Sequence, residues 1–364
     1  MAKAPSKKIA QKSEQELAAL LPFPSHGSPM LPGVEVESYN VELREKRRFV
    51  GDRANKKAFA SLVEKWRKIV ENESDEKLRE LSLKKLSRKK LEQILTKGEP
   101  EAAAVVQAAI DDFAKRLADV IERYLEIDEW KKTELIFVGG GMSGSRIGEL
   151  AIGRVQSLLY ERKISLKLQV IRSDPDEAGL MGAAFLAPSW IFKGYDAILA
   201  ADIGGTNMRA GVVKIRRSKK GELKSISVAR SSIWEHAEDD PERAEAVEHL
   251  VGMLKRLVRW SRKHKILLAP FVGIGCPGRI RMDGAIDRGA QNLPGNWEAD
   301  RFNLPALVSE QLTVFPGQRT AVVMHNDAVV QGLSELLRAG KTRHWAALTI
   351  GTGLGNAKFR MRDL

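Results

Sequence analysis

The sequence predicts an α/β fold with two domains. Short apolar segments alternate with segments of helical periodicity along most of the chain, which is typical of α/β proteins. From about Tyr195, three strand-like segments follow one another before the alternation resumes, so this part opens as an antiparallel meander. Glycine-rich loops follow several of the predicted strands. At 364 residues the chain is long enough for two domains of ordinary size.

The composition favours a cytoplasmic protein without a membrane span. Hydrophobic residues make up 43% of the chain and charged residues 29%, and no apolar run approaches the roughly 18 residues that a spanning helix needs. The lysines near the N-terminus precede no apolar core, so residues 1–16 do not resemble a secretory signal. A single cysteine, Cys276, excludes an internal disulfide and a four-cysteine zinc site.

The formal net charge is +13, and the basic residues are clustered. Such clusters are found on nucleic-acid surfaces, on solvated helix faces and in proteins that attract phosphorylated ligands. No aromatic residues alternate with the clusters, so we do not expect nucleic acid as a partner. The clusters lie at Arg44–Arg48, Lys84–Lys90, Arg216–Lys220 and Arg256–Lys265.

The first half predicts a proline-rich N-terminal segment followed by helices and two strands. Residues 1–39 are interpreted as a tail and an extended loop. Gly98 and Pro100 mark the start of a long helix, because proline suits a first helical position. Helices are predicted from Lys56, behind Ser87, from Pro100 to about Ile127, from Ser143 and over 176–187, and strands over 134–138 and 166–171.

The second half predicts the meander and then strand–helix alternation. Asp240 is expected to cap a helix that ends near Lys263. Apolar segments on either side of short glycine-containing turns predict two hairpins, one around Gly204–Asn207 and one around Gly351–Gly355. Strands are predicted over 196–203, 208–215, 224–233, 268–276, 320–325, 346–350 and 356–360, with a further helix over 327–337.

The first hairpin turn is a candidate phosphate site. Gly204 and Gly205 would let backbone N–H groups approach a phosphate without interference from a Cβ, and Thr206 and Asn207 add polar groups. Asp202, at the end of the preceding apolar strand, could hold Mg²⁺ through water. The alternative is a tight hairpin turn without a ligand.

Two more glycine loops extend this pattern. Gly351, Thr352 and Gly353 repeat the strand–turn–strand arrangement near the other end of the chain. Gly139, Gly140 and Gly141 lead from a strand into a helix N-terminus, which favours anions. A dinucleotide-binding fold is disfavoured, because no helix follows Gly273–Gly278 and the acid required after Gly139 could only be Glu161, which precedes its strand.

Asn326 and Asp327 lie where a buried strand is predicted to meet a helix. A carboxylate at that position could accept a proton from a substrate hydroxyl, as phosphoryl transfer requires. The alternative is that Asp327 caps the helix. In the polar loop 291–297, Asn292 could bind sugar hydroxyls or be an ordinary turn residue, and Trp297 could equally belong to the core.

Together these residues resemble the ROK family of sugar kinases and repressors. In that family the adenosine loop and the closing helix come last, whereas here they precede the first phosphate motif. The resemblance therefore implies a circular permutation, joined at residues 189–195. The matching stretches are Asp202–Thr206, Gly273–Gly278 with Asn292–Gly295, Asn326–Asp327, Gly351–Gly355, Val138–Gly141 and Ala178–Ala187.

The resemblance implies the actin-like ATPase (ribonuclease H-like) fold, with a ligand cleft between two domains. Residues 40–173 with 344–364 would form the large domain and 174–343 the small domain. ATP and Mg²⁺ would be the cofactors and a sugar the substrate, and a homodimer is compatible with the family. Asp327 would be the catalytic base, Asp202 the metal contact, Asn292, Asn326, Asp327 and Gly278 the sugar contacts, and the three glycine loops the nucleotide site.

One departure from the family keeps other functions open. Its E-x-G-H sugar motif and cysteine-rich zinc loop are missing, so zinc is not expected, and only Ser25–Gly27, with His26, resembles part of that loop. The alternatives are a sugar-responsive regulator, although the first 97 residues lack a compact helix-turn-helix, and a catalytically inactive sugar- or nucleotide-binding protein.

Overall fold

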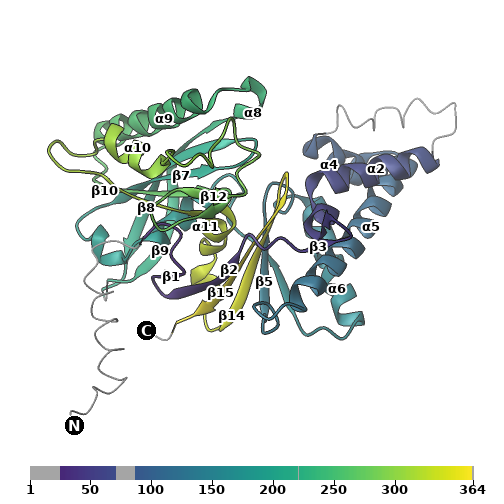
Figure 1. Cartoon of the computed structure of the whole chain (residues 1–364). Helices are drawn as coiled ribbons and strands as arrows, with labels where there is room; N and C mark the ends of the chain where they lie inside the picture. Colours follow the sequence, from purple (N-terminus) through teal and green to yellow (C-terminus); the bar gives the residue numbers. More distant parts are fainter. Residues whose placement is uncertain (1–24, 71–86, 220, 363–364) are drawn as a thin grey trace, which may run out of the picture.

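The structure is a computed structural model that describes residues 25–70, 87–219 and 221–362. It consists of two α/β bodies side by side, each built on a central sheet with helices packed against it (Figure 1). The green body contains residues of the predicted meander, and the second body combines the purple, blue-green and yellow parts of the chain. The predicted two-domain α/β class is thus confirmed. None of the described helices is long and apolar enough to cross a membrane.

The first body contains a five-stranded sheet in the order β13–β10–β7–β8–β9. The strands β7, β8 and β9 are antiparallel neighbours, and β10 and β13 extend the sheet in parallel. The strands are β7 (Ala197–Ile203), β8 (Met208–Arg217), β9 (Leu223–Trp234), β10 (Leu268–Cys276) and β13 (Ala321–Asn326), and the small hairpin is β11 (Arg279–Ile280) with β12 (Ile286–Arg288). The helices are α7 (Ala178–Gly182), α8 (His236–Asp239), α9 (Arg243–Lys263), α10 (Leu304–Gln311), α11 (Asp327–Leu333) and α12 (Leu336–Ala339), with 3₁₀ turns η3 (Ala183–Leu186) and η4 (Ser189–Phe192).

The second body contains a six-stranded sheet in the order β1–β2–β15–β14–β5–β6. Here β2, β15 and β14 are antiparallel neighbours, and β5 and β6 extend the sheet in parallel. The strands are β1 (Met30–Leu31), β2 (Val34–Tyr39), β5 (Leu135–Gly139), β6 (Lys167–Val170), β14 (His344–Ile350) and β15 (Leu354–Met361), and a separate hairpin is β3 (Arg44–Glu45) with β4 (Arg48–Phe49). The helices are η1 (Val50–Ala54), α2 (Lys56–Val70), α4 (Arg88–Lys97), α5 (Pro100–Leu125) and α6 (Arg146–Glu161).

The two sheets follow one plan. Each sheet has three neighbouring antiparallel strands, and two further strands lie parallel to the first of these three, on its outer side. The five positions are occupied by β7, β8, β9, β10 and β13 in one sheet and, in the same order, by β14, β15, β2, β5 and β6 in the other. In the five-stranded sheet these positions are filled in chain order. In the six-stranded sheet the first two positions are filled by the last two strands of the chain, β14 and β15.

The assignment of residues 1–39 to a tail and extended loop is wrong for residues 30–39. Val34–Tyr39 forms β2, which pairs antiparallel with β15, and Met30–Leu31 pairs with it in turn. Val34 and Val36 are buried, so the segment has a period-two pattern that the neighbouring prolines obscured. The Trp130 indole also donates a hydrogen bond to Ser38 Oγ at 3.2 Å. Residues 1–24 lie outside the described residues.

Two helix boundaries also differ from the expectation. Asp240 does not cap the helix that ends at Lys263; it has a left-handed backbone (φ 43°) and ends α8. The cap of α9 is Glu242, whose side chain and that of Glu245 form a capping box. The helix predicted over 176–187 is α7 followed directly by η3.

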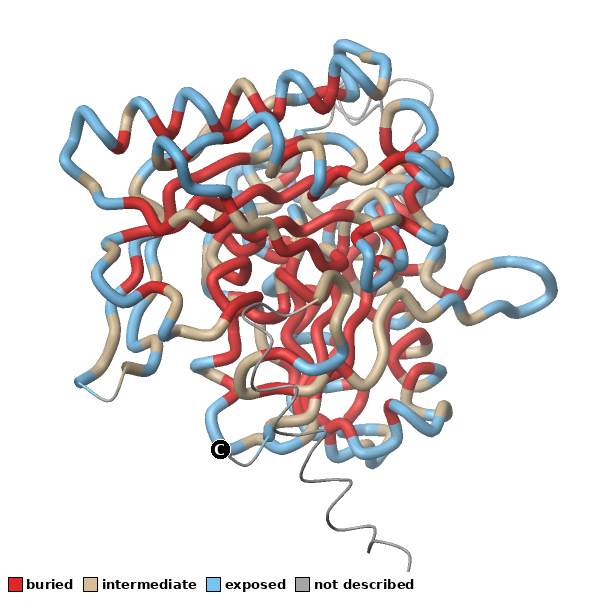
Figure 2. The backbone as a smooth tube through the Cα atoms, turned by 60° about the vertical axis from the view of Figure 1, so that its left-hand side comes forward, coloured by how far each residue is buried: buried red, intermediate tan, exposed pale blue. Residues whose placement is uncertain are grey.

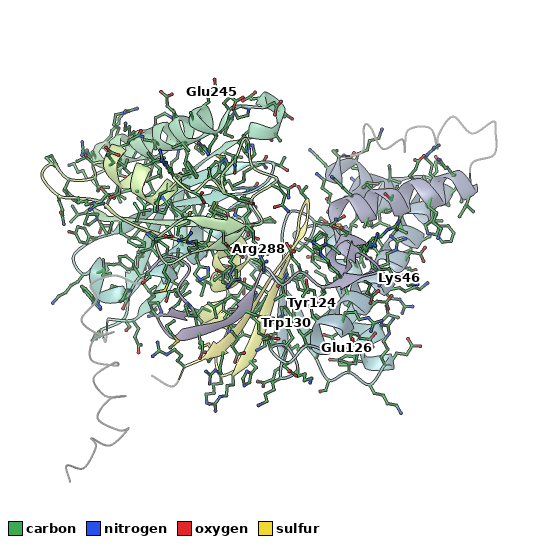
Figure 3. The ribbon with its side chains drawn as sticks, viewed as in Figure 1. Lys46, Tyr124, Glu126, Trp130, Glu245 and Arg288 are labelled. Carbon is green, nitrogen blue, oxygen red and sulfur yellow. The ribbon has the colours of Figure 1, made fainter. Side chains whose placement is uncertain are left out.

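The core of each body lies between its sheet and its helices, and the buried residues, red in Figure 2, lie mainly in the interior of the molecule. Tyr124 and Trp130 pack with ring centroids 4.7 Å apart in the six-stranded body (Figure 3). The two bodies share a third cluster, which includes α7 and α11 and residues of both sheets. In this cluster α7 and α11 cross so closely that a Cβ on Gly182 would lie 1.7 Å from the carbonyl oxygen of Val330.

This crossing predicts a strong stability effect. Gly182→Ala should lower the free energy of unfolding by about 2 kcal/mol or more, because the backbone of α11 cannot accommodate the added methyl group without shifting. Gly153→Ala is the matched control: outside its own helix backbone and chain neighbours, no atom of the described residues lies within 4 Å of the added Cβ, and this position in α6 should gain up to about 1 kcal/mol. Urea unfolding of both variants measures this, and equal stability of Gly182→Ala and wild type would contradict the close crossing.

Candidate active site

The turns of the two hairpins meet between the two bodies. The hydroxyl oxygens of Thr206, in the β7–β8 turn, and Thr352, in the β14–β15 turn, lie 3.2 Å apart and share a hydrogen bond. These threonines are 146 residues apart in the chain and belong to different sheets. The structure therefore brings together two of the three predicted phosphate loops.

The first loop is a closed turn with exposed polar groups. The Gly204 N–H donates to the carbonyl oxygen of Asn207 at 2.9 Å, which closes the turn. Thr206 is exposed. A Cβ on Gly205 would lie 3.0 Å from Cβ of Asn292, so the predicted sugar loop packs directly against the first phosphate loop. Asn292 itself is exposed, and its neighbour Trp297 is a buried core residue whose indole donates to Pro294.

The second and third loops lie next to each other. The Gly351 N–H donates to the Gly353 carbonyl at 2.9 Å. Gly140 follows β5 with φ +91°, and a Cβ there would lie 2.4 Å from the carbonyl oxygen of Ile350, so a glycine is required at that approach. Apart from their chain neighbours, no atom of the described residues lies within 4 Å of a Cβ on Gly141 or Gly353.

The third loop does not enter its helix as early as predicted. Gly139 is the last residue of β5, and helix α6 begins at Arg146 with Ser145 as its cap, not at Ser143. Ser143 instead donates its hydroxyl to the Gly140 carbonyl at 2.8 Å. The first helical N–H groups therefore lie several residues beyond the three glycines.

Asp202 is a buried carboxylate with one oxygen unpaired. The residue is 2% exposed, and its Oδ1 has no hydrogen-bond partner among the described residues. A Cβ on Gly179 of α7 would lie 2.3 Å from Asp202 Cγ, so the carboxylate is pressed against that helix. Burial raises the pKa of Asp202, and the nearby Arg209 guanidinium, 3.6 Å from Oδ2, opposes this rise.

This environment fits a hydrated cation. Among the described residues, no group of three or more His, Cys, Asp and Glu side chains could hold a metal ion directly. A single buried carboxylate oxygen without a partner is suited to a Mg²⁺ ion that keeps several waters and is held largely by substrate phosphates.

Asn326, not Asp327, caps helix α11. Its side-chain oxygen accepts hydrogen bonds from the N–H groups of Ala328 at 3.0 Å and Val329 at 3.3 Å. Its side-chain nitrogen donates to the carbonyl oxygen of Gly278 at 2.9 Å. The interpretation of Asp327 as the cap is therefore wrong. Asn326 thereby joins the end of β13 to the predicted sugar loop.

The Asp327 carboxyl has a pKa well above the ordinary value for an aspartate. Burial, followed by the negative charge of nearby Asp202, raises its pKa to about 7, although it is not fully enclosed. Groups that take up protons during catalysis are typically tuned toward the operating pH, and 7 lies in that range. Asp202 and Asp327 also raise the pKa of buried Cys276, after burial itself, so these three groups lie close together at the ends of β7, β10 and β13.

Sequence reasoning did not identify Arg209 and Asp176. Arg209 lies opposite Asp202 in the β7–β8 ladder and donates from Nε and Nη2 to Asp176 Oδ1, at 3.0 and 2.7 Å. The pair ties the loop before α7 to the first hairpin. The alternation of side chains along β8 was the available signal, because it places the side chain at position 209 on the same face as that of Asp202.

His325 was also missed, although it directly precedes the Asn326–Asp327 pair. Its Nδ1 accepts a hydrogen bond from the Asn326 N–H at 2.7 Å, and its Nε2 donates to the carbonyl of Ser28 at 3.1 Å. Burial lowers the pKa of His325 to about 4, so the ring is neutral at physiological pH. It links the N-terminal segment to the end of β13.

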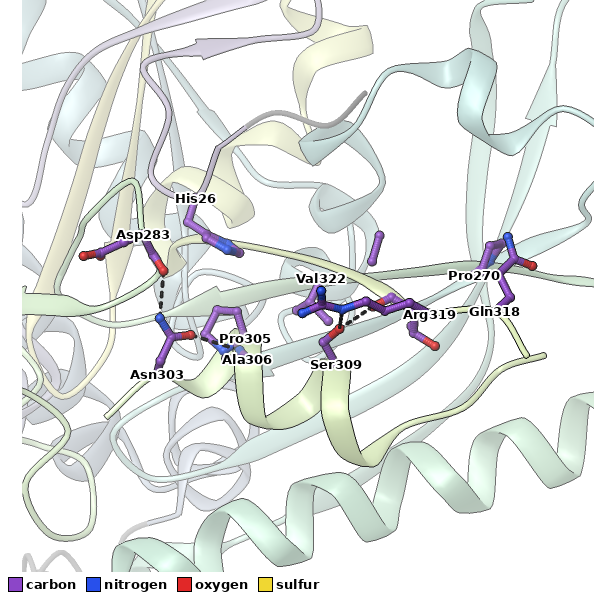
Figure 4. A pocket seen from close by; sticks show the side chains of 12 residues that line it. His26, Pro270, Asp283, Asn303, Pro305, Ala306, Ser309, Gln318, Arg319 and Val322 are labelled. Carbon is purple, nitrogen blue, oxygen red and sulfur yellow. Dashed lines mark hydrogen bonds between the residues drawn. The ribbon is translucent and has the colours of Figure 1, made fainter. Parts of the chain in front are cut away.

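The structure places His26 apart from the predicted sugar and nucleotide residues. His26 lines a pocket of about 560 Å³ beside β13 and α10, together with Asp283, Asn303 and Arg319 (Figure 4). Its Nδ1 accepts a hydrogen bond from the Met324 N–H at 3.1 Å. None of the predicted nucleotide or sugar residues lines this pocket.

Part of the chain is similar to known sugar kinases. No family model matches the chain. Over 160 residues it is 31% identical to the glucokinase of Thermotoga maritima. This match covers 43% of this chain and 43% of the relative. The predicted resemblance to sugar kinases is confirmed over that stretch. The chain spans less than half the length of this curated relative.

Solved structures of related description match with low scores. A Listeria monocytogenes protein described as an N-acetylmannosamine kinase has a TM-score of 0.29 at 22% identity, over 45% of this chain and 47% of its own. The ROK hexokinase of Thermus thermophilus has a TM-score of 0.30 at 24% identity, over 44% of this chain and 45% of its own.

The raised pKa of Asp327 predicts a stability cost. A carboxyl with a higher pKa in the folded than in the unfolded state binds more protons when folded, so its contribution to stability falls as pH rises from about 4 to about 7. Asp327→Asn should therefore raise the free energy of unfolding at pH 8 by roughly 1–3 kcal/mol, and by much less at pH 4.

Urea unfolding at both pH values measures this effect. Asp300→Asn, in an exposed loop, is the control and should change stability little at either pH. A destabilised Asp327→Asn protein at pH 8 would contradict the assigned environment of Asp327.

Proposed function

We propose that this protein is an ATP-dependent sugar kinase that transfers the γ-phosphoryl group of ATP to a sugar hydroxyl. The observation that supports this most is the meeting of two glycine hairpins at Thr206 and Thr352, in a molecule that also holds a carboxyl of pKa about 7 at Asp327. Phosphoryl transfer depends on positioned phosphates and a base for the acceptor. The similarity of part of the chain to a glucokinase supports the same conclusion.

The glycine loops would hold the nucleotide. In this proposal the phosphates are contacted by the N–H groups of the loops Gly204–Asn207 and Gly351–Gly353 that do not already close the turns, and Gly139–Gly141 lies against the adenosine. Asp202 would hold Mg²⁺ through water, and its unpaired buried oxygen supports that role. The ion would neutralise charge on the phosphates during transfer.

Asp327 would act as the general base. Its carboxylate would take the proton from the attacking sugar hydroxyl as that oxygen forms a bond to the γ-phosphorus. The bond from the γ-phosphorus to the β–γ bridging oxygen breaks, and ADP leaves with the electron pair. A base with a pKa near 7 is half ionised at neutral pH, so it can both accept this proton and release it afterwards.

Asn292, Asn326 and Gly278 would shape the sugar site together with Asp327. The packing of Asn292 on Gly205 supports a sugar placed next to the phosphate loop. Asn326 would act mainly by holding the Gly278 loop, because its oxygen already caps α11. These contacts concern the acceptor, and they do not identify which sugar is used.

We propose further that the chain is a circular permutation of the sugar-kinase order. The filling of the first two positions of the six-stranded sheet by β14 and β15 supports this. The large domain would then comprise residues 40–173 and 344–364, joined by strands β1 and β2, and the small domain would comprise 174–343. A homodimer stays a prediction.

An inactive sugar- or nucleotide-binding protein is the second candidate. It is favoured by the position of His26, whose Nδ1 is engaged by the backbone of β13 in a separate pocket.

A coupled ADP-release assay tests the proposal. With Mg·ATP and a panel of hexoses and N-acetylhexosamines, wild type should show sugar-dependent turnover. Asp327→Asn should lower kcat by about a hundredfold or more, because it removes the base, while Asp300→Asn should leave it unchanged. ATP binding without turnover for every sugar would instead favour the inactive binding protein.

The pH dependence of this turnover gives a separate prediction. The base must be ionised, so kcat/KM should fall as pH drops below about 7 and level off above it. Initial rates between pH 5.5 and 8.5 measure the midpoint. A profile that is flat across this range would exclude Asp327 as a base with the stated pKa.

A further inference from the structure

His236 contacts the first phosphate loop from behind. It is the first residue of α8, separated from the end of β9 by Glu235 alone, and it is only 2% exposed. Its Nε2 lies 2.8 Å from the carbonyl oxygen of Gly204. Since a carbonyl oxygen can only accept, His236 donates this hydrogen bond.

The next residue makes a second contact of the same kind. The Ala237 N–H donates to the carbonyl oxygen of Thr206 at 3.2 Å. Two carbonyl groups of the loop, those of Gly204 and Thr206, are therefore held by the start of α8. They are separated by one residue, so they belong to alternate peptide groups of the turn.

The orientation of these carbonyls determines where the following N–H groups point. All described peptide bonds are trans, and in a trans peptide the C=O and the N–H of the same plane point in opposite directions. The N–H groups of Gly205 and Asn207 must then face away from α8. Within the described part of the chain, neither N–H has an acceptor. Successive N–H groups directed to one side form the kind of concave site that binds phosphate oxygens.

His236 is itself held in place by an aromatic group. Trp234, the last residue of β9, packs beside it with ring centroids 5.8 Å apart, and its indole donates to Asp239 Oδ2 at 2.6 Å. Trp234 also stacks on His249 of α9, with ring centroids 4.0 Å apart and an interplanar angle of 3°. The donor on His236 is thus fixed relative to both the sheet and α9.

We propose that His236 is a positioning residue that orients the first glycine loop so that the N–H groups of Gly205 and Asn207 face the phosphates of the nucleotide. This inference rests on the proposed function for the identity of the ligand. The contact to Gly204 does not depend on that function. His236 does not touch the nucleotide in this proposal, because its ring lies behind the loop.

The test uses variants that separate the donor from the bulk of the ring. His236→Phe and His236→Met lack the donor, whereas His236→Gln can present an amide N–H near the position of Nε2. His249→Phe is the matched control, because it alters the packing on Trp234 at a residue that makes no hydrogen bond to the loop among the described residues. Circular dichroism and thermal unfolding show whether each variant folds. If His236→Phe does not fold, His236→Met takes its place as the variant without the donor.

Two readouts are needed on the full chain. Isothermal titration with Mg·ATP should give a Kd about tenfold higher for the variants without the donor, the size expected for one lost buried hydrogen bond and a poorly oriented loop. His236→Gln and His249→Phe should stay within about twofold of wild type. Hydrogen exchange of the 203–208 peptide, measured without nucleotide, should be faster in the Phe and Met variants only.

The outcomes distinguish the inference from the proposed function. Unchanged exchange and unchanged Kd in a folded Phe or Met variant would overturn the role of His236. The same loss in His236→Gln and His249→Phe as in His236→Phe would also overturn it, because packing would then explain the effect. If wild type binds no Mg·ATP while exchange at 203–208 still responds to His236, the proposed nucleotide function fails and the orienting contact stands.

Discussion

The close packing of α7 is the constraint on which the site depends. Two glycines of this short helix allow it: Gly182 meets the backbone of Val330 in α11, and Gly179 meets the carboxylate of Asp202. Neither approach leaves room for a Cβ. Because α7 and α11 lie where the two bodies share their core, this packing both joins the sheets and closes one side of the site.

The electrostatics of the site follow from that packing. With α7 pressed against it, Asp202 is removed from water, and its charge acts on Asp327 through a medium that screens little. The same burial that would make Asp327 a useful base also costs folding free energy at neutral pH. An energetically unfavourable group of this kind is expected at a position where the residue is required for function and not for stability.

The backbone around the site is oriented by side chains that sequence motifs do not contain. Asn326 holds α11 and the Gly278 loop, Arg209 holds the loop before α7, and His236 holds the turn at Gly204. Each makes a contact to an element distant in the chain or across a turn. Glycine motifs indicate where a backbone is free to bend, but the supporting contacts decide in which direction its N–H groups point.

The sequence by itself determined the α/β class, most strands, the three glycine loops and the Asn326–Asp327 pair, because local periodicity and turn residues are properties of short segments. Only the tertiary structure decided that residues 34–39 complete the six-stranded sheet, that Thr206 meets Thr352, and that His26 lies in a separate pocket. It also decided that Asn326 rather than Asp327 caps α11. These features arise from pairing and burial between distant segments, and a single sequence does not encode those distances in any local pattern.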